Sequence, residues 1–354
     1  ESGNGGFGPL RVKRRTRGEG ENMQIEKVKN VMLAMQRFSW EQGVAAQAMW
    51  EIGEDSLALL MANEAIHRQT EDGRLGVTHP SMDAVDPGAN GLPVWWAYRT
   101  TGKKIYKEAA EKMAAYFLSA PRSQAGLIYH NADAHRTMID GVYHMAPFLT
   151  AMGHTDLALE QIRLFRKVHL DPHTHLYSQI WDDDQNGFSK KEFWGCGVGW
   201  MLGALSLTAS QLEEGEKSAK EELSAYLREG VESFLPWVTE KGLTHDILDD
   251  SSTFEETAAV AMTAYAIYRG IQAGILSGRY KETADRFYTI IESFVDEDGY
   301  LRQGCDAPTF DRPGVSAEDQ AFALMCWAAK RDLEEGIAFR FAGRRLFASQ
   351  SASS

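Results

Sequence analysis

The sequence predicts an all-α protein in which six helical hairpins close into an (α/α)6 barrel, a six-hairpin toroid. Two observations carry this prediction. One repeating unit recurs six times along the chain, and the two helices of each unit differ in their pattern of apolar residues. Each unit is about 45–65 residues long, which suits two helices and their loops at about 1.5 Å rise per residue.

The parts of the unit follow the same order in each copy. An apolar helix rich in small residues comes first, a glycine turn follows, and then come an amphipathic helix and a short extended piece. Gly53, Gly102 and Gly153 mark the turn in the first three copies. The units are expected to start near residues 39, 86, 138, 193, 253 and 316, and the first five to end at 71–76, 126–129, 175–178, 241–244 and 298–301.

The two kinds of helix predict two concentric rings. The first helices are apolar nearly all round, which indicates burial on every side, as in 44–49, 201–207, 257–267 and 320–329. The second helices carry an apolar stripe against a charged face, as in 106–118, 156–168 and 217–234. Six such pairs can close into a ring that buries every repeat, whereas an open solenoid is the alternative arrangement.

The charge balance excludes two classes of partner. Lys and Arg number 37 against 50 Asp and Glu, which gives a formal net charge of −13. Such a surface repels nucleic acid and anionic membranes, although a pocket of opposite local field can still attract a small acidic substrate. No apolar run reaches the about 18 residues of a membrane helix, so none is expected. The sequence leaves the oligomeric state open.

The cysteines and the chain ends suggest where the protein acts and how it is divided. Cys196, Cys305 and Cys326 are few and widely spaced, which favours a reducing compartment over a disulfide framework. No signal peptide is visible, so a cytoplasmic location is expected. We expect a flexible leader over residues 1–22, one catalytic barrel domain over 23–347, and a frayed tail over 348–354.

The starts of the inner helices should meet at one end of the barrel. Partially positive helix ends and unpaired N–H groups would then converge on a central cavity, a favourable setting for carboxylates. Aromatic rings stack on sugar faces and carboxylates supply acid and base, so the mixture found at these starts suggests a carbohydrate site. The candidates are Trp40, Glu41, Asp83, Asp86, His130, His135, Asp140, Trp194, Glu255, Glu256, Glu318 and Asp319.

Asp140 differs from the other carboxylates in its surroundings. Asp83 and Asp86, like Ser252 and Ser316, precede predicted helices, where capping is the commoner role. Asp140 instead stands within an apolar run, where burial of a carboxylate is costly without a partner or a function. Burial should raise the pKa of Asp140, as a proton donor requires.

Two patterns resemble metal sites without completing one. His169, His173 and His175 share a loop with Pro172 and lack further evident ligands. The segment 182–187 matches the first half of a calcium loop, but Phe193 stands at position 12, so a solvated acidic loop is expected. No nucleotide-binding motif or nucleophile elbow is found, and we expect neither a metal nor another cofactor.

Five segments together resemble a known group of enzymes. They are Met-Asp-Ala-Val-Asp-Pro-Gly (82–88), Tyr-His (129–130), Met-Ile-Asp-Gly-Val-Tyr-His-Met-Ala-Pro-Phe (138–148), Phe-Trp-Gly-Cys-Gly-Val-Gly-Trp (193–200) and Glu-Glu-Thr-Ala (255–258). In this order they resemble the unsaturated glucuronyl and rhamnogalacturonyl hydrolases of glycoside hydrolase families 88 and 105, and family 105 more closely. The resemblance covers almost all of the chain after the leader.

The resemblance implies an (α/α)6 fold and a hydrolysis that begins at a double bond. Its substrates are oligosaccharides left by lyases, whose terminal uronic acid carries a C4=C5 bond to which water is added. By motif match, Asp140 would be the acid and base, and Asp83 a second carboxylate that orients substrate or water. His130 and Trp194 would line the sugar subsite. The other substrate-binding residues expected are Trp40, His135, Gln179, Trp181 and Trp200.

Three departures from the family pattern stand near these residues. Met138 replaces a tryptophan two residues before the catalytic Asp, Gln179 replaces a histidine, and Cys196 replaces an arginine. We expect the lost Arg and His to affect the choice of sugar and to leave proton transfer intact. Two other classes stay open: a conventional inverting glycosidase or sugar epimerase on the same barrel, and a non-catalytic carbohydrate-binding barrel.

Overall fold

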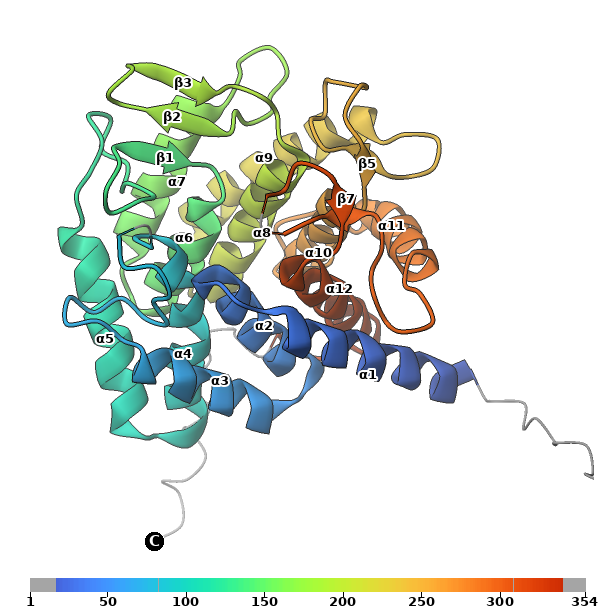
Figure 1. Ribbon diagram of the computed structural model, residues 1–354, viewed down its shortest axis with the longest axis horizontal. Helices are drawn as coiled ribbons and strands as arrows, with labels where there is room; N and C mark the ends of the chain where they lie inside the picture. The colour runs from blue at the N-terminus through green and yellow to red at the C-terminus, as the bar shows by residue number, and fades with distance from the viewer. Residues whose placement is uncertain (1–16, 82, 308, 340–354) are drawn as a thin grey trace, which may run out of the picture.

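A computed structural model describes residues 17–81, 83–307 and 309–339, and it confirms the all-α barrel. Within these residues, six helices form an inner ring (Figure 1). Each inner helix packs against the next, and the last packs against the first, which closes the ring and excludes the open solenoid. The inner helices are α2 (Ser39–Ile52), α4 (Gly91–Thr101), α6 (Gly141–Ala151), α8 (Gly195–Gln211), α10 (Ala258–Gln272) and α12 (Ala317–Glu335).

The outer ring comes from the amphipathic helices of the repeat. Each packs on the inner helix before it and buries one face, as α7 does with Ala158, Ile162 and Phe165. The first five outer helices are α3 (Asp55–His67), α5 (Lys104–Ser119), α7 (Thr155–His169), α9 (Lys217–Phe234) and α11 (Lys281–Ser293).

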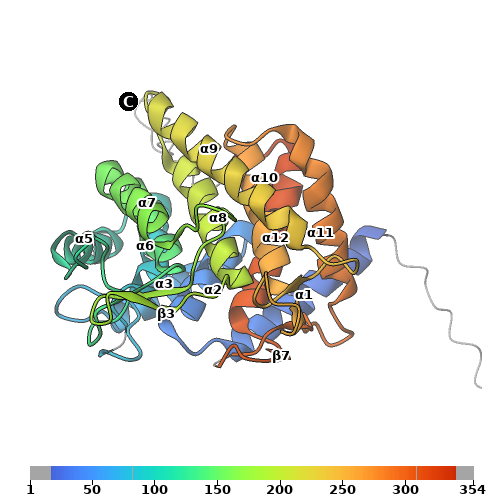
Figure 2. The ribbon, with the colours of Figure 1, turned by 90° about the horizontal axis from the view of Figure 1, so that it is seen from above.

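The sixth hairpin is made from the two ends of the described chain. Its outer helix is α1 (Arg17–Met35), which packs along α12 (Figure 2). Helix α1 begins at Arg17, ahead of the expected start of folded structure near Met23. The rest of the expected leader, residues 1–16, and the expected tail, residues 348–354, lie outside the described residues.

Glycines let the inner helices approach closely. A Cβ on Gly199 would lie 2.6 Å from the Cβ of Met262 on α10, and one on Gly203 would lie 2.9 Å from the Tyr143 ring on α6. Helix α8 therefore packs against both neighbours where larger residues would clash. No helix in the described ranges is long and apolar enough to span a bilayer.

Short antiparallel strands and the 3₁₀ turn η1 surround the end of the barrel where the inner helices begin, whereas η3 joins α10 to α11 at the opposite end. The strands form one three-stranded sheet and two two-stranded pairs, too small to change the fold class. They are β1 (Arg136–Met138), β2 (Ile180–Asp182) and β3 (Gly187–Lys190), β4 (Thr244–His245) with β5 (Glu255–Glu256), and β6 (Gly304–Cys305) with β7 (Pro313–Gly314). The 3₁₀ turns are η1 (Asp86–Asn90), η2 (Leu235–Trp237) and η3 (Gly278–Tyr280).

A left-handed turn introduces the extended piece that follows each of the first five outer helices. Glycine takes this turn in four repeats, with φ of 102° at Gly73, 97° at Gly126, 82° at Gly242 and 99° at Gly299. The third repeat has His175 there, with φ of 57°. A side chain in this conformation carries a steric cost that glycine avoids.

Candidate active site

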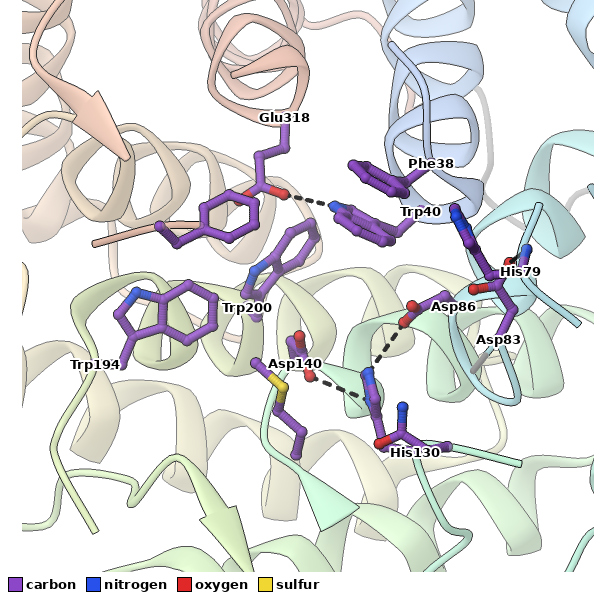
Figure 3. Close-up of a pocket in the computed structure, with 13 residues that line it drawn as sticks. Phe38, Trp40, His79, Asp83, Asp86, His130, Asp140, Trp194, Trp200 and Glu318 are labelled. Atoms are coloured by element: carbon purple, nitrogen blue, oxygen red, sulfur yellow. Dashed lines mark hydrogen bonds and ion pairs between the residues drawn. The ribbon is translucent and has the colours of Figure 1, made fainter. Parts of the chain in front are cut away.

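A cavity of about 320 Å³ opens where the inner helices begin (Figure 3). Segments from five repeats contribute to its wall, because the N-terminal ends of the inner helices meet at this end of the ring. Most of its lining is aromatic or carboxylic. The residues are Phe38, Trp40, His79, Asp83, Asp86, His130, Asn131, Met138, Asp140, Trp194, Trp200, Phe310 and Glu318.

Asp140 lies at the N-cap position of α6, next to the first residue of an apolar inner helix. Its residue is only 9% exposed. Burial raises the pKa of Asp140 above its ordinary value, and the nearby His130 and His144 oppose this increase without cancelling it. A carboxyl group with a raised pKa is suited to donate a proton near neutral pH.

His130 lies between two carboxyl groups. Its Nδ1 is 3.5 Å from Oδ1 of Asp140, and its Nε2 is 3.3 Å from Oδ1 of Asp86, as the dashed lines of Figure 3 mark. Burial lowers the pKa of His130, but the charges of Asp86, Asp140 and Asp83 outweigh burial and the pKa is raised. His130 is therefore stabilised as an imidazolium beside Asp140.

Asp86 joins a second histidine to this chain. Its Oδ1 is also 3.3 Å from Nδ1 of His144 on α6. Burial raises the pKa of Asp86, yet the charges of His130 and His144 outweigh it and hold the pKa below the ordinary value. Asp86 is thus a buried carboxylate, and the order Asp140, His130, Asp86, His144 is a continuous chain of ionisable groups.

Asp83 has a different set of partners. Its Oδ2 accepts hydrogen bonds from the backbone N–H groups of Thr78 and His79, each at 2.9 Å. Arg74 donates to its backbone oxygen at 2.5 Å. Asp83 lines the cavity, and its hydrogen bonds hold the preceding loop in place. The carboxylate that contacts His130 is instead Asp86, for which the sequence favoured the role of a helix cap. A catalytic role for Asp83 stays a prediction.

Aromatic rings form one wall of the cavity. Trp40 stacks on Phe38 with ring centroids 4.7 Å apart and an angle of 4° between the ring planes. Glu41 accepts a hydrogen bond from the backbone N–H of Phe38 at 3.0 Å and so caps the start of α2. This contact fixes the backbone that carries Phe38 and Trp40. Trp194 at the N-cap of α8 and Trp200 on its second turn face the same space.

Glu318 adds a carboxyl group opposite Asp140. The indole N–H of Trp40 donates to its Oε2 at 2.8 Å, whereas its buried Oε1 has no hydrogen-bond partner. Burial raises the pKa of Glu318 to about 8; the Trp40 hydrogen bond opposes this, and nearby Glu41 and Asp140 reinforce it. The protonated group can donate a hydrogen bond into the cavity.

Of the nine residues expected to act in catalysis or substrate binding, three lie outside the cavity lining, and so do the helix-start candidates Glu41, Glu255, Glu256 and Asp319. His135 lies on an exposed loop and pairs with Asp184 at 2.9 Å. Trp181 on β2 donates its indole N–H to Asp183 at 2.8 Å. Gln179 lies buried just before β2, and its backbone oxygen accepts the N–H of Ile139. The expected residues that do line the cavity are Trp40, Asp83, His130, Asp140, Trp194 and Trp200.

Several residues at the cavity wall or directly behind it carry no local signal in the sequence. Phe38 and Phe310 lie in loops, and His144 lies within an apolar helix, where a satisfied core histidine is the simpler interpretation. Met138, recognised as a departure from the family pattern, lines the cavity. Asp86 and Glu318 were among the candidates at the helix starts. In the sequence they look like residues that cap a helix, and only the folded ring shows that they face the cavity.

The acidic loop over 182–187 is the turn between β2 and β3. Its carboxylates already have protein donors: Arg136 binds Asp182 at 2.8 Å, and Tyr129 donates to Asp183 at 2.7 Å. These contacts pack the loop against the rest of the chain.

The chain is similar to known proteins in both sequence and fold. The chain is 26% identical over 279 residues to the unsaturated rhamnogalacturonyl hydrolase YesR of Bacillus subtilis (strain 168), an alignment that covers 74% of this chain and 77% of the relative.

Solved structures share the fold. A family 105 glycoside hydrolase of C. acetobutylicum ATCC 824 matches with a TM-score of 0.73 and 18% identity, over 87% of this chain and 99% of that one. The unsaturated glucuronyl hydrolase of Bacillus sp. GL1 matches with a TM-score of 0.68 and 15% identity, over 93% and 99%. The family model described as Glycosyl Hydrolase Family 88 matches residues 14–316, and the chain therefore belongs to this family of glycoside hydrolases.

Proposed function

We propose that this glycoside hydrolase releases a terminal 4,5-unsaturated uronic acid from lyase-generated oligosaccharides by adding water across the C4=C5 bond. The observation that carries the proposal is the buried Asp140, whose pKa is raised, at the wall of a cavity lined with aromatic rings. The activities of the unsaturated uronyl hydrolases named above support it.

Asp140 supplies the proton in the first step. The C4=C5 bond is part of a vinyl ether, so a proton delivered to C4 leaves positive charge shared between C5 and the ring oxygen. The Asp140 carboxylate then takes a proton from water as that water attacks C5. The hemiketal opens at C5, which leaves a hemiacetal at C1 that expels the attached sugar.

The ionisable chain behind Asp140 supports both steps. The His130 imidazolium, 3.5 Å from Asp140, stabilises the carboxylate that forms after proton donation. Asp86 on the other side holds His130 in its charged form and orients the ring. Asp86, or Asp83 beside it, is then the second carboxylate, which positions water or substrate.

The opposite wall is suited to an acidic sugar. Trp40, Trp194 and Trp200 offer ring faces and edges for the sugar. The protonated Glu318 offers an O–H donor that a uronate carboxylate can accept, in a cavity whose described lining contains no lysine or arginine. Gln179, Trp181 and His135 lie outside the cavity lining, so we assign them no contact with the terminal sugar.

The test uses unsaturated disaccharides from pectin, glycosaminoglycan, ulvan and arabinogalactan lyases, with absorbance of the conjugated double bond as the measurement. We expect one class to lose absorbance, and Asp140→Asn to lower kcat by about 10²–10⁴-fold, the usual contribution of a general acid and base. The exposed Asp298→Asn serves as the control. Full activity in Asp140→Asn contradicts the mechanism.

An isotope effect separates the proposal from conventional hydrolysis. An inverting glycosidase breaks the bond at C1 first, so deuterium at C4 of the substrate should leave kcat/KM unchanged. Protonation of C4 changes this carbon from sp² to sp³, and the same label should then give an inverse secondary isotope effect on kcat/KM. An effect of deuterium at C1 and none at C4 favours the conventional glycosidase.

The three free cysteines, all buried, support a reducing and hence cytoplasmic site of action. Fractionation of the source cells followed by immunodetection of the chain tests this assignment. Recovery from the medium alone contradicts it.

A further inference from the structure

Behind the wall of the cavity lies a buried group of thiols and carboxylates. Cys196 begins the first turn of α8, Glu256 ends β5 just before α10, and Cys305 ends β6. All three are 0% exposed. One ligand atom from each lies within 4.8 Å of the others, and the two Sγ atoms are 3.5 Å apart.

A further carboxyl group lies next to Cys305. The Asp246 residue is 9% exposed, and its Oδ1 is 3.6 Å from Sγ of Cys305. Around a tetrahedral Zn²⁺, with bonds of about 2.3 Å to sulfur and about 2.0 Å to oxygen, two sulfurs lie about 3.8 Å apart and sulfur and oxygen about 3.5 Å. The two measured separations are close to these edges.

Asp319 independently indicates that a cation belongs here. It is 0% exposed, and neither of its carboxyl oxygens has a hydrogen-bond partner. A Cβ added to Gly304, the neighbour of Cys305, would lie 2.0 Å from its Oδ2, so this carboxyl is directed at the same strand. A buried carboxyl group without donors is neutralised either by a proton or by a nearby positive charge, and a cation bound at Cys305 would supply that charge to Asp319.

We propose that Cys196, Cys305 and Glu256 bind one structural Zn²⁺, that the Asp246 carboxylate beside Cys305 turns toward the ion to take the fourth position, and that Asp319 is a neighbouring carboxylate that balances the charge. Two thiolates and two carboxylates suit a borderline-soft cation and not Ca²⁺ or Mg²⁺, which prefer oxygen alone. Glu256 already accepts from the N–H of Ala259 and the hydroxyl of Thr244, contacts that orient it as outer-shell bonds orient metal ligands.

An ion at this position would stabilise the junction between two inner helices and two loops. The backbone oxygen of Asp246 accepts the N–H of Gly195 at 2.8 Å, and Trp194 forms a bridge with Ile247. The ion would therefore tie the starts of α8 and α10 to the loops that carry Asp246 and Cys305. Trp194, which lines the cavity, is held at this junction.

Metal content of the full chain tests the proposal. The protein is purified without chelators from zinc-supplemented culture and analysed by inductively coupled plasma mass spectrometry. We expect about one zinc per chain in the wild type, and less than about a tenth in Cys305→Ser and Glu256→Gln. Cys326→Ser, which alters the third buried cysteine, should retain the zinc. A wild type without zinc, before and after incubation with ZnCl2, overturns the proposal.

Two measurements on the wild type do not depend on variants that fold. Zinc removal by a chelator should lower Tm, and ZnCl2 alone should restore it. Replacement of zinc by Co²⁺ should produce the intense visible and near-ultraviolet bands of tetrahedral cobalt with thiolate ligands. A Cys196–Cys305 disulfide in unreduced tryptic digests, or cobalt spectra without thiolate bands, overturns the assignment.

Discussion

Asp140 experiences two opposing influences on its pKa. Burial favours the neutral acid, whereas the His130 charge, 3.5 Å away, favours the carboxylate. The balance leaves the pKa raised, so a larger fraction of Asp140 is protonated at a given pH than of an ordinary aspartate. A group that first donates a proton and then acts as a base needs a pKa that is raised but still allows the group to ionise.

Removal of the imidazolium should shift this balance. In His130→Asn the charge that lowers the pKa of Asp140 is lost while burial remains, so the pKa of Asp140 rises further. We expect the alkaline limb of the kcat/KM profile to move to higher pH, and kcat to fall because the carboxylate loses its partner. The pH profile of both enzymes checks this, with the exposed His173→Asn as the control. An unshifted limb contradicts the role given to His130.

Glu318 should make substrate binding sensitive to alkaline pH. Its pKa is raised to about 8, so it is a neutral donor below this pH and a carboxylate above it. The added charge repels an anionic substrate, and KM should therefore rise as pH increases through about 8. Glu318→Gln stays neutral and should remove this rise, as KM measured from pH 6 to 9 will show. The same rise in the variant would assign it to another group.

At the scale of single elements, the return turns show where one repeat departs from the others. Gly73, Gly126, Gly242 and Gly299 take a left-handed conformation that His175 takes in the third repeat. The His175 side chain gains only a contact of 3.5 Å with Glu229, in which the two side chains are 48% and 34% exposed. Such a contact contributes little to stability.

His175→Gly should therefore stabilise the protein. Relief of the left-handed conformation outweighs the lost ion contact, and the free energy of unfolding should increase by up to about 1 kcal/mol. Chemical denaturation measures the change. The matched control is His173→Gly in the same loop, where φ is not positive and glycine should reduce stability. Equal effects of the two variants would contradict this explanation.

At the scale of the whole molecule, the ring is closed by contacts between distant segments. Arg269 on α10 is 0% exposed and binds Glu51 on α2 at 2.6 Å and Asp332 on α12 at 2.9 Å. These residues lie near the C-terminal ends of their helices, so the network joins three inner helices at the end opposite the cavity.

Arg269→Met should destabilise the barrel strongly. The substitution leaves Glu51 and Asp332 buried without their cation, a loss that costs about 3–5 kcal/mol in comparable pairs. Thermal and chemical unfolding measure it, with Arg286→Met on the exposed side of α11 as the control. A change below about 1 kcal/mol would show that the two acids are neutralised in another way.

Helix α1 should contribute to the barrel as a full member of the outer ring. Met32 on α1 is 0% exposed, so Met32→Ala should lower the free energy of unfolding by about 2–5 kcal/mol. Leu60→Ala on α3, where the side chain is 62% exposed, should change it by less than about 0.5 kcal/mol. Equal effects in denaturant titrations would contradict the pairing of α1 with α12.

The sequence by itself determined the hairpins, the two kinds of helix, the end of the barrel that holds the cavity, and the position of Asp140 at that end; the catalytic role of Asp140 stays a prediction. Apolar periodicity, glycine turns and an acid in an apolar run are local patterns, and each limits what a segment can become. Only the tertiary structure decided that α1 completes the sixth hairpin and that Asp86 contacts His130. It also joined Trp40 to Glu318, which are 278 residues apart. Such contacts form when the ring closes and brings distant helix starts together. A local sequence pattern cannot predict which of these distant residues will meet.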